Sequence, residues 1–192
     1  MKNCDAIIIG GSAGSLDVLL KVFPSLSTLI TFPIIIVLHR KAGADSLLTA
    51  LLSSKTKLIV KEVEEKETIS PGLIYLAPSD YHLLIENNRT FSLDSSEKIN
   101  YSRPSIDVTF QSAAEVYKAN LVCLLLSGAN TDGAAGLQFV KKYGGQALIQ
   151  NPESAAVSYM PAYAEGSVAI DRILQIEEMG EYINGLSGKH NL

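Results

Sequence analysis

Three side chains that together can activate a hydroxyl for attack on a carbonyl each stand just after an apolar run of this sequence. Ser12 lies in the glycine-rich turn that follows the first run, His39 follows the second, and Asp132 follows a run near residue 125. A serine hydroxyl is a poor nucleophile until a base takes its proton, and an acidic partner fixes the tautomer of that base. These residue types predict a Ser-His-Asp hydrolase site.

Each residue taken alone also has a plainer interpretation. Ser12 fits a packing turn with a helix-capping serine, and His39 fits a structural histidine with satisfied ring nitrogens. Asp132 precedes Gly133, as a turn residue or helix N-cap would. The placement of all three at strand ends favours the catalytic interpretation.

The glycine-rich turn also raises the possibility of a dinucleotide site. The G-x-G-x-x-G fingerprint fails in the register that begins at Gly10, because Ser12 and Ser15 occupy the later glycine positions. The second strand ends in His39 and Arg40 instead of the acidic residue that holds a ribose, although an arginine there suits the 2′-phosphate of NADP. The turn does match G-x-S-x-G, which presents a serine between a strand and a helix.

The elements around these residues follow an alternating strand and helix rhythm. The strands are continuous apolar runs, which indicates burial on both faces and a mostly parallel sheet. We therefore predict a three-layer α/β/α fold with a doubly wound sheet, in which the carboxyl ends of the strands bring the three residues to one edge. The expected strands of this sheet are 6–9, 33–38, 58–63, 121–126, 147–150 and 168–170, a further apolar run at 73–76 falls in the insertion described below, and the expected helices are 15–23, 45–52, 105–118, 134–142 and 176–186.

The length of 192 residues predicts one domain, residues 1–192. The segments 81–86 and 90–93 flank Asn87-Asn88 with the spacing of an antiparallel hairpin. This hairpin is the one insertion that we expect in the parallel fold, at about residues 73–95.

Composition excludes several further classes of protein. The 47% apolar and 19% charged residues exclude wholesale disorder, and a net charge of −4 argues against nucleic acid as a partner. The apolar runs fall short of the roughly 18 residues of a membrane span, and a secretory signal is not evident, so we expect a cytoplasmic protein without direct membrane insertion. Cys4 and Cys123 are expected to be buried, reduced thiols.

Several segments in order resemble the catalytic domain of the chemotaxis protein-glutamate methylesterases of the CheB type. The resemblance extends from about residue 4 to residue 186. The matching segments are Ile7-Ile8-Ile9-Gly10-Gly11-Ser12-Ala13-Gly14, residues 33–39 and 71–82, Ser102-Arg103-Pro104-Ser105-Ile106-Asp107, residues 127–136, Gln150-Asn151-Pro152-Glu153-Ser154 and Met160-Pro161.

The resemblance implies that Ser12 is the nucleophile, His39 the general base and Asp132 the residue that orients the base. It implies hydrolysis of glutamate γ-methyl esters, and deamidation of glutamines in some cases, on methylated cytoplasmic helices of chemoreceptor-like proteins. Neither a metal nor an organic cofactor is expected. The backbone N–H groups of Ala13 and Ala129 are the expected oxyanion donors.

This sequence departs from the family pattern at the loops that hold those donors. Ala129 and Asn130 stand where the family usually has methionine and glycine, and Ala13 replaces a threonine. The substitution at Asn130 raises the question of whether the loop keeps its backbone conformation. Arg40 and Arg103 are candidates to pair with carboxylates near the modified glutamate, or are structural.

Two further histidines and the regulation of the enzyme complete the expectations. His82 either lines the site from the insertion or lies on the surface, and His190 belongs to a polar tail. The chemotaxis enzymes usually carry a phosphoacceptor domain before the catalytic domain, whereas here we expect no such control in cis. A separate response-regulator protein is therefore a candidate partner. The alternative function is a non-catalytic domain that docks on a receptor or regulator.

Overall fold

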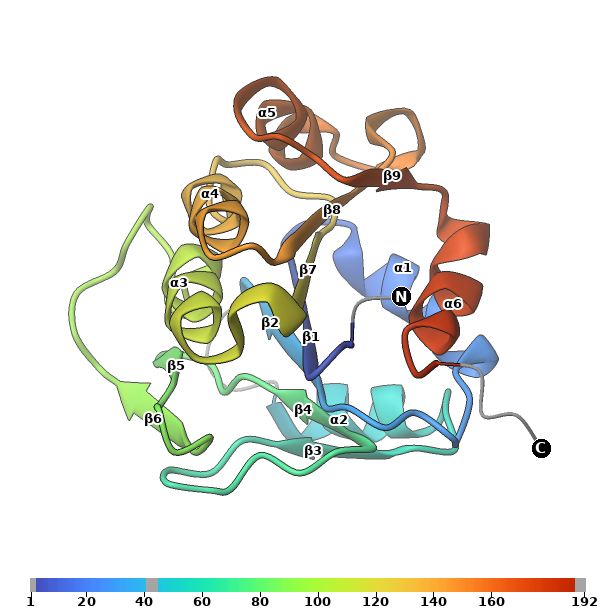
Figure 1. Cartoon of the computed structure of the whole chain (residues 1–192), viewed down its shortest axis with the longest axis vertical. Coiled ribbons are helices and arrows are strands. Elements are labelled where there is room, and N and C mark those ends of the chain that lie inside the picture. Colours follow the sequence, from blue (N-terminus) through green and yellow to red (C-terminus); the bar gives the residue numbers. More distant parts are fainter. Residues whose placement is uncertain (1–2, 41–44, 189–192) are drawn as a thin grey trace.

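A computed structural model describes residues 3–40 and 45–188, and its centre is a seven-stranded parallel sheet (Figure 1). The strands follow the order β3-β4-β2-β1-β7-β8-β9 across the sheet, and every neighbouring pair is parallel. The predicted doubly wound sheet is confirmed. The strands are β1 (Ala6–Gly11), β2 (Ile34–Leu38), β3 (Ile59–Glu62), β4 (Leu73–Leu76), β7 (Leu121–Leu125), β8 (Gln146–Gln150) and β9 (Arg172–Leu174).

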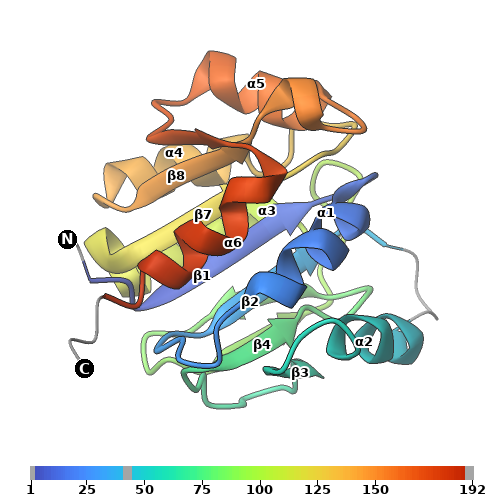
Figure 2. The same ribbon diagram turned by 90° about the vertical axis from the view of Figure 1, so that its right-hand side faces the viewer.

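Helices cover both faces of the sheet and give the predicted three layers. One face carries α1 (Ser15–Val22), α2 (Asp45–Ser53) and α6 (Ile176–Gly185), which lie in front of the sheet in Figure 2. The opposite face carries α3 (Ile106–Tyr117), α4 (Ala134–Lys142) and α5 (Tyr159–Ser167). Short 3₁₀ turns occur at Phe23–Ser25, Lys118–Asn120 and Pro152–Ser154.

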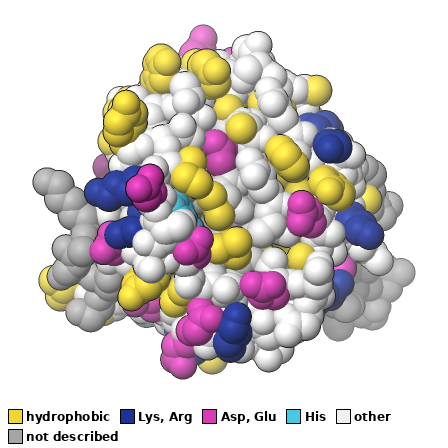
Figure 3. Space-filling view, turned by 90° about the vertical axis from the view of Figure 1, so that its left-hand side faces the viewer, with side chains coloured by type: hydrophobic (Ala, Val, Ile, Leu, Met, Phe, Trp, Pro, Cys, Tyr) yellow, Lys and Arg dark blue, Asp and Glu magenta, His cyan; other side chains and the backbone are white. Residues whose placement is uncertain are grey.

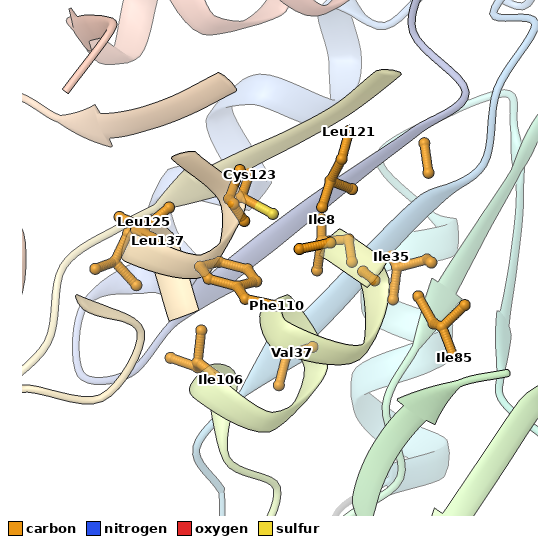
Figure 4. Close-up of a cluster of buried hydrophobic side chains, with 14 of the residues drawn as sticks. Ile8, Ile35, Val37, Ile85, Ile106, Phe110, Leu121, Cys123, Leu125 and Leu137 are labelled. Carbon is orange, nitrogen blue, oxygen red and sulfur yellow. The ribbon is translucent and has the colours of Figure 1, made fainter. Parts of the chain in front are cut away.

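The two cores follow from the alternation of side chains along each strand. Ile8, Ile35 and Cys123 point to the α3 face, where they pack with Phe110 (Figure 4). Their neighbours one residue earlier along each strand point to the α1 face and join the other cluster. Because a strand presents successive side chains to opposite faces, an uninterrupted apolar run supplies both cores at once.

The antiparallel insertion is smaller than the sequence predicted. It consists of β5 (His82–Ile85) and β6 (Phe91–Asp94), which form a separate two-stranded sheet packed against α3. The expected start at residue 73 is wrong, because β4 pairs with β2 and β3 inside the main sheet. Ile74 and Leu76 of this strand are completely buried, which is why this four-residue apolar run belongs inside the main sheet, between β3 and β2.

The C-terminal part of the chain differs from the expected elements in two ways. The edge strand β9 lies at Arg172–Leu174, not at 168–170, and Asp171 directly before it holds the strand through its side chain, which accepts a hydrogen bond from Ala147 N–H at 2.7 Å. Helix α5 is not among the helices expected from the sequence. Its apolar pattern is interrupted by Pro161, which a helix tolerates in its first turn.

The order of the strands places a topological switch between β1 and its two neighbours. From β1 the chain passes through α1 to β2 on one side, and it later returns to β7 on the other side. Ligands of open α/β sheets bind outside the carboxyl ends at such a point. Ser12, His39 and the loop that carries Asp132 all follow strands at this edge.

The remaining expectations concern membrane spans, the two cysteines and His190. Within the described ranges, no helix is long and apolar enough to cross a membrane. Cys4 and Cys123 are both free thiols, with Cys123 buried and Cys4 partly buried. His190 lies outside the described residues.

Candidate active site

Ser12 stands on a turn whose backbone is fixed by neighbouring loops. Its N–H group donates to Ser127 O at 2.9 Å and also approaches Ser15 Oγ at 3.1 Å. Gly14 has a φ of +83° and caps the N-terminus of α1, so the chain turns sharply from strand to helix. The positive end of the α1 dipole therefore faces the region of Ser12.

The loop after β7 packs closely against Ser12. A Cβ atom on Gly128 would lie 3.1 Å from Ser12 Cβ and 2.5 Å from Met160 Cε, so a larger residue here would displace the Met160 side chain and press on Ser12. The Ser127 hydroxyl donates to Ala13 O at 2.7 Å and accepts from Val157 N–H at 2.9 Å. These contacts join the turns after β1 and β7 to the segment that leads into α5.

His39 follows β2 and is held beside the serine turn by the strand register. Gly11 pairs with Leu38, and the His39 N–H group donates to Gly11 O at 3.1 Å. The imidazole Nε2 lies 2.7 Å from Asp132 Oδ2, and Nδ1 lies 3.2 Å from Ser102 Oγ. Among the described residues, no hydrogen bond joins Ser12 Oγ to the imidazole; such bonds often form fully only when substrate is bound.

Asp132 is completely buried at the N-terminus of α3. Besides His39, its carboxylate accepts hydrogen bonds from the Ser105 hydroxyl at 2.9 Å and from the N–H groups of Ile106 at 2.7 Å and Asp107 at 3.1 Å. Burial works against the charged form, but the bond from His39 and the two backbone bonds outweigh it and hold the pKa of Asp132 below 3.8. Asp132 is therefore a charged acceptor.

The charge on Asp132 determines which histidine nitrogen can act as a base. A carboxylate only accepts hydrogen bonds, so Nε2 of neutral His39 carries the proton and Nδ1 is the basic atom. In the familiar serine-protease triad the aspartate contacts Nδ1 and the serine contacts Nε2. The ring here is used in the opposite sense, and its basic nitrogen faces the Ser102 hydroxyl.

Ser102 has a contact with His39 that the sequence does not predict, and both predictions for His82 are wrong. His82 neither lines the site nor lies on the surface, because it is 1% exposed. Its Nε2 contacts Glu97 O at 2.9 Å, and its Nδ1 accepts from Ser105 N–H at 3.1 Å. His82 thus supports Ser105, whose hydroxyl reaches Asp132. The contacts of Ser102 and His82 depend on how segments distant in the sequence pack together, which no local motif reveals.

A pocket of about 330 Å³ opens beside the imidazole. It is lined by His39, Arg40, Asp80, Lys98, Tyr101, Ser102 and Arg103. Figure 3 shows basic and acidic side chains gathered around a small exposed area of histidine at the left of the molecule.

The two arginines of this pocket make contacts within the protein. Arg103 binds Asp80 Oδ1 at 2.7 Å and the carbonyl groups of Ser95 and Ser96, which supports the structural interpretation. Arg40 donates to Ala77 O at 2.6 Å and lies 3.4 Å from Glu62.

The expected oxyanion donors face the same edge. Ala13 and Ala129 are both exposed, and within the described part of the chain their N–H groups donate to no protein acceptor. Asn130 has no positive φ, so the replacement of a glycine there causes no backbone strain. Its side chain accepts from Asp132 N–H at 3.2 Å and donates to Asn100 O at 3.4 Å.

The arrangement defines a class of protein. A serine on a tight turn after the central strand, beside a histidine bonded to a buried aspartate, is typical of α/β serine hydrolases. In the regions that the structure describes, no group of three or more His, Cys, Asp or Glu side chains could hold a metal ion.

Comparison with known proteins identifies the family. The family model of the CheB methylesterase matches residues 7–183. The catalytic domain of the Thermotoga maritima CheB methylesterase superposes with a TM-score of 0.91 at 34% identity, over 96% of this chain and 99% of that one. The chain belongs to the CheB methylesterase family, as its sequence motifs predicted.

Curated relatives carry a matching name. A protein of Leptospira interrogans is 43% identical over 179 residues, which is 93% of each chain, and is named a putative protein-glutamate methylesterase/protein-glutamine glutaminase. A Thermotoga maritima relative named protein-glutamate methylesterase/protein-glutamine glutaminase is 38% identical over 158 residues. The match spans 81% of this chain but 46% of that relative.

Proposed function

We propose that this chain hydrolyses glutamate γ-methyl esters on protein substrates, with Ser12 as nucleophile, His39 as general base and Asp132 as the residue that orients the base. The observation that carries the proposal is the 2.7 Å bond between His39 Nε2 and Asp132, made beside the Ser12 turn in a member of the CheB methylesterase family. The names of the relatives support the same activity.

The first half of the reaction forms an acyl-enzyme. His39 Nδ1 takes the Ser12 hydroxyl proton while Oγ attacks the ester carbonyl carbon. The N–H groups of Ala13 and Ala129 stabilise the oxyanion, and Asp132 stabilises the imidazolium through Nε2–H. Collapse of the tetrahedral intermediate breaks the carbon–OCH₃ bond, and the imidazolium returns its proton to the leaving methoxide, so methanol departs.

The second half regenerates the enzyme. His39 Nδ1 removes a proton from water, whose oxygen attacks the acyl carbon, and Ser12 Oγ leaves with a proton returned by the ring. The products are a glutamate carboxylate and free Ser12. The same steps applied to a glutamine side chain release ammonia in place of methanol, so deamidation needs no additional group.

The proposed partners rest on membership of the CheB methylesterase family. The substrates are the methylated helices of chemoreceptor-like proteins, and a separate response-regulator protein is a candidate for control of the reaction. The pocket beside His39 carries Lys98 on its rim, a cation suited to the acidic side chains that flank a methylated glutamate. The alternative of a docking domain without catalysis is not favoured, because relatives across nearly the whole chain are named as enzymes.

The decisive experiment measures methanol release from methylated receptor membranes. We expect release by the wild-type protein and a loss of roughly 10⁴-fold or more in the Ser12→Ala variant, because the nucleophile is removed. Ser54→Ala is the matched control, since this serine is exposed just after α2 and its hydroxyl donates to the nearby Leu51 O.

Two results would contradict the proposal. Equal slow release by wild-type and Ser12→Ala proteins would exclude Ser12 as nucleophile. Failure of a serine-directed phosphonate to label Ser12, with the protein folded by circular dichroism, would exclude an activated hydroxyl.

A further inference from the structure

Helices α3 and α4 cap each other's N-termini with two buried carboxyl groups. Asp132, just before α4, accepts the N–H groups of Ile106 and Asp107 at the start of α3. Asp107, in the first turn of α3, accepts the N–H groups of Gly133 at 2.9 Å and Gly136 at 2.6 Å at the start of α4. The exchange needs close helix packing, because a Cβ on Gly136 would lie 3.0 Å from Asp107 Cα.

This exchange brings the two carboxyl groups close together. Asp107 is 6% exposed and Asp132 is completely buried, and the Asp107 N–H group donates to Asp132 Oδ1 at 3.1 Å. Asn100 Nδ2 lies 3.2 Å from Asp107 Oδ2 and 3.4 Å from Asp132 Oδ1, so one amide touches both groups. Two carboxylates this close together repel each other strongly when buried, whereas one shared proton turns the repulsion into a hydrogen bond.

We propose that Asp107 is a positioning residue for the reaction, which as a neutral acid donates a hydrogen bond to Asp132 and holds that carboxylate toward His39. The inference rests on the proposed function for its catalytic consequence. Asp107 does not reach the reacting atoms; it acts through Asp132, which the mechanism needs charged.

The surroundings of the pair assign the proton to Asp107. Burial and the charge of Asp132 raise the pKa of Asp107 to about 7, although bonds from Gly136 and Gly133 oppose the shift. Asp132 is the charged group that faces it, and His39 stands behind Asp132. The groups at the start of α4 that face Asp107 are backbone N–H groups. The group that faces Asp107 from the 95–104 loop is the neutral side chain of Asn100.

Loss of this proton at higher pH has a defined effect. A second negative charge then lies against Asp132, the hydrogen bond between the two groups disappears, and the carboxylate that orients His39 is pushed away. Activity should therefore fall as the pH rises through about 7. An amide at this position cannot lose its proton, so Asp107→Asn should keep its activity into the alkaline range.

The test compares the pH profiles of kcat/KM for methanol release in wild type, Asp107→Asn, Asp107→Ala and Glu115→Gln. Glu115 lies exposed on the same helix and serves as control. We expect the alkaline fall in wild type and Glu115→Gln, its absence in Asp107→Asn, and a loss of tenfold or more at every pH in Asp107→Ala. Identical profiles for wild type and Asp107→Asn, or an asparagine variant as weak as the alanine variant, would overturn the proposal.

A second measurement needs no activity and separates this proposal from the proposed function. The stability that the Asp107 proton provides is fully present below the ordinary pKa of 3.8 and is lost as the pH rises toward about 7. Urea unfolding of wild type should show that decline, and Asp107→Asn should not. A decline of equal size in both proteins would place the proton elsewhere, even if neither protein released methanol.

Discussion

The two described histidines, His39 and His82, lie in adjoining regions and differ in what holds their rings. His39 contacts a charged carboxylate through Nε2 and a serine hydroxyl through Nδ1, and its side chain is 11% exposed. His82 is buried and bonded to the main chain at both nitrogens. Main-chain groups cannot rotate away, whereas a hydroxyl can turn from donor to acceptor.

Because of this difference, we expect His39 to exchange protons and His82 to hold a loop in place. Nδ1 of His39 can receive a proton while Ser102 rotates to accept a bond from it. His82 can gain a proton only by losing the bond from Ser105 N–H. Four substitutions in and around the site test that distinction, from the largest expected effect to the smallest.

Substitution of the exchanging histidine should abolish activity and leave the fold intact. We expect His39→Gln to lower kcat/KM for methanol release by roughly 10⁴-fold, because the base is lost. Asp132 keeps its bonds from Ser105, Ile106 and Asp107, so thermal unfolding should change little. A variant that unfolds several degrees earlier while retaining activity would reverse the assignment of the two histidines.

The buried histidine should show the opposite balance. His82→Leu leaves the buried N–H of Ser105 without its acceptor, which should lower the free energy of unfolding by about 1–3 kcal/mol. Activity of the folded fraction should fall about tenfold at most, through the displacement of the Ser105 hydroxyl from Asp132. Urea denaturation and methanol release on the same sample measure both. Full stability combined with a complete loss of turnover would argue for a chemical role.

The hydroxyl at Nδ1 should have a moderate effect. Ser102→Ala removes one hydrogen bond to the imidazole, and a net bond of about 1 kcal/mol corresponds to about a fivefold lower kcat. KM should stay unchanged because the ring, not the substrate, loses a contact. Ser102→Thr retains the hydroxyl and is the matched control. A loss near that of His39→Gln would instead make Ser102 the nucleophile.

The smallest effect is expected where this chain departs from the family loop. Asn130→Gly removes two long hydrogen bonds, at 3.2 and 3.4 Å, without relieving any strain. We expect kcat/KM to change by less than about threefold, since such bonds contribute little net free energy. An increase of tenfold or more would show that the asparagine restrains the Ala129 amide.

Much of the architecture follows from the sequence because its strands are uninterrupted apolar runs. Such runs predict a parallel sheet, and the carboxyl ends of its strands then bring Ser12, His39 and the Asp132 loop to one edge. The short edge strand β9 and the helix α5 could not be placed, because an edge strand buries little and Pro161 interrupts the helical pattern.

The partners of the site residues were harder to predict than the residues themselves. Contacts such as Ser102 with His39 and Asp107 with Asp132 join segments 63 and 25 positions apart. They depend on how the insertion and the helix ends pack, and no periodicity or motif encodes that. The burial of His82 depends on the same packing. The sequence therefore predicted, wrongly, that His82 lines the site or lies on the surface.

The Ser127 hydroxyl has a consequence for how this enzyme can evolve. It ties the carbonyl of Ala13 to the amide of Val157, so three connections of the chain share one small polar atom. Threonine can supply the same atom, but a residue without a hydroxyl would lose both side-chain bonds and leave only the backbone bonds from Ser12 N–H to Ser127 O and from Gly128 N–H to Val157 O. Changes in substrate preference should therefore accumulate in the exposed turn around Tyr101, where a new side chain meets solvent, and spare the completely buried Ser127.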